Sequence, residues 1–184
     1  MQADTFIKLV KEQFPIQHPD ASRLFEGIRS ESGCEKLEFL VHVKWPDLTL
    51  DMLEEVAGEF WQMSSVWNRY FLPGFMCLTA KHDIEIETHT LKTGAFIEVA
   101  QTQEALMTCI SSYFHSMMWF MTVRWDIATN LFYGLTSSQM DLIETWLYNI
   151  DFDTLNEAGE LFGGFDYSKE AIEIFVKKAR TYSV

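Results

Sequence analysis

Cysteine is scarce in this chain of 184 residues, and the three cysteines, Cys34, Cys77 and Cys109, share no close spacing. An odd number of scattered cysteines does not fit a disulfide framework, and without a C-x-x-C pair a structural zinc site is disfavoured. We therefore expect reduced thiols and a cytoplasmic location. The N-terminal residues 1–15 carry charges and lack a small-residue cleavage site, so they are typical of a first helix rather than a secretory signal.

Basic residues are also few. The sequence has 14 Lys and Arg against 27 Asp and Glu, which gives a net charge of −13. Such a chain repels phosphates, so the composition excludes a nucleic-acid partner and favours a basic protein instead. The alternative is that the negative charge serves only solubility.

Long uninterrupted apolar runs are missing. Residues 105–123 contain no Asp, Glu, Lys or Arg over a length close to a bilayer span, but serines, threonines and His115 interrupt them. This polarity predicts a buried helix of a globular domain and no membrane partner.

Catalytic and cofactor motifs are lacking as well. No Ser or Cys stands between closely spaced glycines, as a nucleophile elbow requires. The segment from Asp151 has Asn156 and Phe162 where a calcium loop needs Gly and Glu, and the glycines that follow lack the Lys of a phosphate loop. We therefore predict no metal, no cofactor and no catalytic residue.

Histidines leave an enzymatic alternative open. If "KHDIEIETH" were extended, Asp83, Glu85, Glu87 and His89 would share a face that holds a divalent metal or supplies a general base. Four side chains along one strand diverge, however, so a solvated face is favoured. His115 within its apolar helix is typical of a buried, hydrogen-bonded histidine, and a catalytic role for it is the weaker reading.

Apolar and aromatic residues are abundant, at 48% and 15%. They suffice for a large core, so we expect one mainly α domain over residues 1–184, an orthogonal helical bundle with a short β-hairpin or extended segment around 81–100. Further helices are expected at 5–13, after Asp20 and from Ser168 to Arg180. Residues 37–45 fit either a short strand or an extended lead into Pro46.

Two helix starts are well marked. Thr49 is a natural N-cap whose preceding Leu48 can pack on Leu53, and an apolar face then continues to Trp61. Thr136 repeats this chemistry with Gln139, in a capping box.

The stretch "WNRYFLPGFM", residues 67–76, predicts a helix that kinks or restarts at Pro73, because proline cannot donate to the carbonyl of Arg69. Gly74 permits another backbone to approach closely. The aromatic residues favour core packing over a ligand site.

Three segments together carry a family resemblance: Trp45, Asp47 and Leu48, then residues 70–75, then Leu135, Thr136 and Gln139. In order and spacing, residues 40–150 resemble a bacterial family of small helical domains of unknown function. The resemblance implies a helical fold and a bacterial setting, and it transfers no catalytic residue.

The most informative pattern is a segment without Lys or Arg, residues 126–168, which contains eight acids interleaved with aromatics. We expect it to form a surface that captures a basic protein, as in an inhibitor or immunity-type partner of a basic toxin. A structural or oligomeric module is a further alternative, with "MMWFM" feeding a homodimer interface. The predicted protein-binding residues are Asp141, Glu144, Tyr148, Asp151, Phe152, Asp153, Glu157 and Glu160.

Overall fold

The fold comes from a computed structural model, which describes residues 1–26, 34–56, 59–92, 105–110, 112–113, 131–150 and 169–183. Within these ranges the regular elements are helices and none is a strand, so the predicted mainly α fold is confirmed. The elements are α1 (Ala3–Gln13), η1 (Ala21–Arg23), α2 (Cys34–Leu37), η2 (Glu38–His42), η3 (Trp45–Asp47), α3 (Leu50–Val56), η4 (Phe60–Gln62), α4 (Ser65–Lys92), α7 (Ser137–Tyr148) and α9 (Lys169–Arg180).

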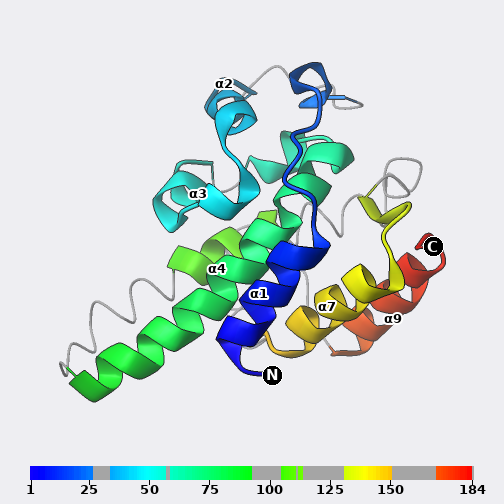
Figure 1. The fold of residues 1–184 in the computed structure, drawn as a ribbon. Coiled ribbons are helices and arrows are strands. Elements are labelled where there is room, and N and C mark those ends of the chain that lie inside the picture. Colours follow the sequence, from blue (N-terminus) through cyan, green and yellow to red (C-terminus); the bar gives the residue numbers. More distant parts are fainter. Residues whose placement is uncertain are drawn as a thin grey trace.

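Helix α4 is the longest element and the others are arranged around it (Figure 1). Helix α1 packs along α4, α7 packs on α1, and α9 packs on α7. The turn η3 packs on α4, and α2 contacts α3. Residues 105–110 and 112–113 are also helical, and Tyr113 of this segment stacks on Phe75 of α4 with ring centroids 4.0 Å apart. Buried residues from all these elements form one hydrophobic core.

Of the predicted kink or restart at Pro73, the restart is wrong, because α4 continues through this residue to Lys92. A proline inside a helix costs about 3 kcal/mol through one lost hydrogen bond and a crowded turn. Core residues on both sides offset this cost: Phe71 and Leu72 before the proline and Phe75 and Met76 after it are almost completely buried. Tertiary packing therefore holds the two halves in one helix.

Gly74 confirms the predicted close backbone approach. A Cβ at this position would lie 2.8 Å from the carbonyl oxygen of Trp45 and 3.0 Å from Cδ2 of Leu48. The turn η3 thus rests directly on the surface of α4, where only glycine leaves enough room.

Residues 37–42 are helical, so the expected strand is wrong, whereas Val43 and Lys44 are extended and form a short lead into η3. Leu37 and Leu40 are both fully buried, and their spacing of three residues suits a helical turn rather than a strand. The same correction applies to the expected hairpin, because residues 81–92 form the end of α4. Residues 93–100 lie outside the described part of the chain.

The predicted caps are present. Thr49 accepts a hydrogen bond from the backbone N–H of Met52 at 3.3 Å, although α3 ends at Val56, earlier than the sequence pattern indicates. Asp20 caps the single turn η1, and its continuation after residue 26 is not described.

Helix α7 begins with the predicted capping box. The backbone N–H of Gln139 donates to Thr136 Oγ1 at 3.2 Å, and that of Thr136 donates to Gln139 Oε1 at 2.9 Å. Gln139 Nε2 also donates to the carbonyl of Gln13 at 2.8 Å, so the cap ties α7 to the end of α1. Helix α9 ends in Lys177, Lys178 and Arg180, as predicted, whereas Ser168 lies outside the described residues.

Replacing Gly74 with Ala tests the contact between η3 and α4. Alanine is the better helix former by about 1 kcal/mol, so an unobstructed site would be stabilised. We expect instead a loss of about 1–3 kcal/mol in the free energy of unfolding, because the new methyl group overlaps the Trp45 carbonyl. Urea denaturation measures this change, and a more stable Gly74→Ala variant would contradict the close approach.

Candidate functional site

Three of the predicted protein-binding residues are described, and all three lie on α7. They are Asp141, Glu144 and Tyr148, and the Tyr148 side chain is 44% exposed. The other five lie outside the described residues: Asp151, Phe152, Asp153, Glu157 and Glu160. The structure therefore presents one end of the expected surface.

Both α7 carboxylates are bound by Arg180 of α9. Arg180 Nη2 donates to Asp141 Oδ1 at 2.7 Å and also to Glu144, and Nε donates to Glu144 Oε2 at 3.1 Å. These hydrogen bonds to Glu144 and Asp141 raise the pKa of the guanidinium. One positive charge is thus shared by two negative ones, which leaves less negative charge on α7 for a partner than the sequence indicates.

A second acidic surface was missed by the sequence analysis, which treated α3 only as a packing element. Four carboxylates on and beside α3 are exposed, and we call them the α3 acidic face: Asp47, Asp51, Glu54 and Glu55. None of them forms an ion pair with the described residues. The sequence signal was available, since Glu54 and Glu55 follow Asp51 by three and four residues and so lie close to it on the helix.

A cavity of about 630 Å³ lies on another part of the molecule. Its walls come from the segment between α1 and η1, from the first turns of α4 and from the loop before α7. The side chains around it combine aromatic rings, prolines and basic groups: Phe14, Pro15, Gln17, His18, Pro19, Arg23, Val66, Arg69, Tyr70, Pro73, Tyr133, Gly134, Leu135, Thr136 and Gln139.

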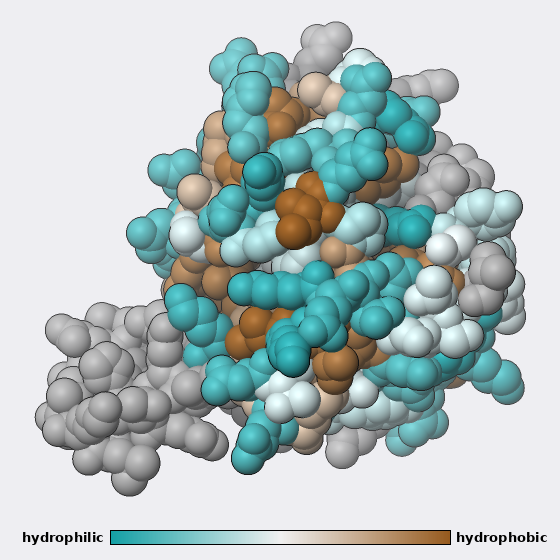
Figure 2. All heavy atoms as spheres, viewed as in Figure 1, coloured by the Kyte–Doolittle hydropathy of each residue, from teal (hydrophilic) through white to brown (hydrophobic). Residues whose placement is uncertain are grey.

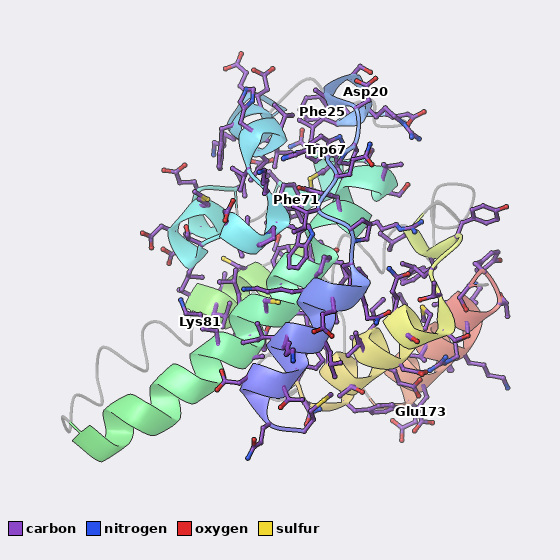
Figure 3. The ribbon with its side chains drawn as sticks, in the orientation of Figure 1. Asp20, Phe25, Trp67, Phe71, Lys81 and Glu173 are labelled. Carbon is purple, nitrogen blue, oxygen red and sulfur yellow. The ribbon has the colours of Figure 1, made fainter. Side chains whose placement is uncertain are left out.

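Aromatic donors hold the first wall of this cavity in place. The prolines at 15 and 19 keep the segment out of a helix, so its carbonyl groups need other partners. Trp45 Nε1 donates to the carbonyl of Pro15 at 3.0 Å, and the Tyr70 hydroxyl donates to that of Ile16 at 3.3 Å. Trp67 Nε1 donates to the carbonyl of Asp20 at 3.2 Å, and Figure 3 shows these two residues close together.

The described charged groups around the cavity are basic. Arg69 donates through Nη1 to the carbonyl of Tyr133, forms no ion pair with the described residues, and has its pKa lowered by burial. Arg23 pairs with Glu26 at 2.7 Å, and both side chains are well exposed.

His18 packs against the ring of Tyr70 at 5.0 Å, and its buried Nδ1 has no hydrogen-bond partner. Burial, followed by the charges of Lys44 and His42, lowers the pKa of His18, which is therefore neutral at pH 7.

The structure tests the enzymatic alternative only in part. Residues 82–89 are helical, so the alternating face of a strand is not formed there, and His115 lies outside the described residues. Burial raises the pKa of the Cys77 and Cys109 thiols to about 11 and about 12, so neither is a thiolate at neutral pH. In the described ranges no three potential metal ligands come together.

Comparisons of the chain with known protein families, with curated proteins and with solved structures give no match. The resemblance to bacterial helical domains therefore stays a prediction. Among the helices that the structure describes, none is both long and apolar enough to cross a membrane.

Replacing Arg180 with Gln tests the ion pair between α7 and α9. Since the groups are partly exposed, we expect a modest loss of about 0.5–1 kcal/mol in the free energy of unfolding, decreasing at high salt. Lys177→Gln on the same helix removes an exposed charge and is the matched control. Equal effects of both variants in urea denaturation at low salt would show that the Arg180 contacts add no stability.

Proposed function

We propose that this protein binds a basic protein partner in the cytoplasm, as an inhibitor or immunity-type partner of a basic bacterial toxin. The observation that carries the proposal is the α3 acidic face, whose four exposed carboxylates form no ion pair within the described part of the chain. The net charge of −13 supports the same class of partner.

The α3 acidic face suits fast capture of a partner. Exposed like charges raise the local negative potential, which accelerates the approach of a positively charged surface and makes the association rate depend on salt. The face also rests on a rigid base, because Leu53 and Val56 of the same short helix are buried in the core. A partner would therefore meet carboxylates whose backbone positions are fixed before binding.

The α7 surface contributes in a different way. Its carboxylates already share Arg180, so the partner gains less from them by electrostatic attraction. The exposed ring of Tyr148 offers an aromatic anchor beside these charges, a residue type that often carries binding energy in protein interfaces. We propose that the five predicted binding residues between 151 and 160 extend this surface.

Neutralising the α3 acidic face tests the proposal. We expect the triple variant Asp51→Asn, Glu54→Gln, Glu55→Gln to bind the basic protein captured by the wild-type chain at least about tenfold more weakly, since three attractive charges are lost. The measurement is quantitative affinity capture from a lysate of the source organism at low and high salt, followed by calorimetry with the captured protein.

The matched control removes the same charge elsewhere. Asp4, Glu170 and Glu173 are exposed on α1 and α9, and Figure 3 shows Glu173 on the opposite side of the molecule from α3. The variant Asp4→Asn, Glu170→Gln, Glu173→Gln should keep nearly wild-type affinity. Equal losses in both variants, or capture that is insensitive to salt, would contradict a specific role of the α3 acidic face.

A further inference from the structure

The cavity bounded by His18, Arg23 and Arg69 has a charge opposite to that of the whole protein. The chain carries a net charge of −13, yet the described residues around this cavity include two arginines and no Asp or Glu. Arg23 is paired with Glu26, so the positive charge at this cavity without a carboxylate partner among the described residues is that of Arg69. It marks a place where an anion is attracted.

Arg69 is the central positive group. Its side chain is partly buried, it lies on α4 next to the core residues Tyr70 and Phe71, and its one described acceptor is the carbonyl of Tyr133. A guanidinium carries several N–H donors arranged to meet two oxygens at once, and burying such a charge without a counterion is costly. A bound carboxylate or phosphate would supply both the acceptors and the counterion.

The position of α7 adds to this attraction. Thr136 and Gln139, at the first turn of this helix, border the cavity, so the positive end of the helix dipole lies beside it. Helix α7 has 12 residues, and its start is fixed by the capping box. The anion would thus approach two independent sources of positive potential, Arg69 and the helix N-terminus.

The remaining walls are apolar and suit an organic group attached to the anion. The segment after α1 contributes Phe14, Pro15 and Pro19. Helix α4 contributes Tyr70, and the loop before α7 contributes Tyr133. The volume of about 630 Å³ is within the range of pockets that hold small molecules and is far larger than a single inorganic ion needs. The surface view in Figure 2 shows that apolar and polar residues also lie side by side on the outer face of the molecule.

We propose that this cavity binds a small organic anion, with its carboxylate or phosphate on Arg69 and Arg23 and its ring against Tyr70 and the prolines. The site is separate from the α3 acidic face and does not depend on the proposed function. A ligand in this position would contact both α4 and the loop before α7, so its binding should stabilise the contact between these two segments.

The test uses four small probes and the full-length protein. Phenyl phosphate and benzoate carry a ring with each kind of anion, inorganic phosphate lacks the ring, and benzamide lacks the charge. We expect phenyl phosphate or benzoate to raise the melting temperature and to give a measurable Kd by calorimetry, and whichever binds more tightly identifies the anionic group. Inorganic phosphate should bind more weakly, and benzamide should not bind.

Variants locate the binding site. Arg69→Gln should raise the Kd about tenfold or more, the loss typical of a charge-assisted hydrogen bond, and the more exposed Arg23→Gln should raise it about two- to fivefold. Lys8→Gln is the control, since Lys8 is exposed on α1 and does not border the cavity. Arg23→Gln keeps the test decisive if Arg69→Gln does not fold. No binding of either aromatic anion, or equal binding by the arginine variants and Lys8→Gln, would overturn the proposal.

Discussion

The contacts of Trp45 are the constraint on which the rest of this structure depends. Its indole N–H binds the carbonyl of Pro15, its backbone N–H binds the Tyr70 hydroxyl at 3.3 Å, and its carbonyl lies against Gly74. The Tyr70 hydroxyl in turn binds Ile16, so one buried residue joins the proline-containing segment, η3 and α4. Because buried polar groups without partners are costly, these bonds fix one arrangement of the three segments.

The arrangement also positions both candidate sites. The Trp45 and Tyr70 bonds hold the wall of the cavity that faces Arg69, while η3 leads directly into α3 and its carboxylates. Among the described residues, four carboxylates without an ion pair therefore lie on and beside α3, and Arg69, a guanidinium without an ion pair, borders the cavity.

Asn68, near the start of α4, adds a second set of buried hydrogen bonds to this helix. Fully buried, it donates through Nδ2 to the carbonyls of Phe60, Met63 and Ser64, and thus fixes the chain just before α4. The backbone carbonyl of Asn68 accepts from the Tyr113 hydroxyl at 2.5 Å, which connects α4 to the helical residues 105–110 and 112–113. Helix α4 is therefore held by hydrogen bonds as well as by apolar packing, consistent with its continuity through Pro73.

The sequence by itself determined what depends on neighbouring residues: the caps at Thr49 and Thr136, the basic end of α9 and the helical class. These features follow from local hydrogen bonding and periodicity, which a short stretch of sequence contains. Only the tertiary structure decided that α4 passes through Pro73, that residues 37–42 are helical, that Arg180 binds two predicted binding residues, and that Arg69 borders a cavity. Each of these depends on groups far apart in the chain, whose burial and charge outweigh the local preference.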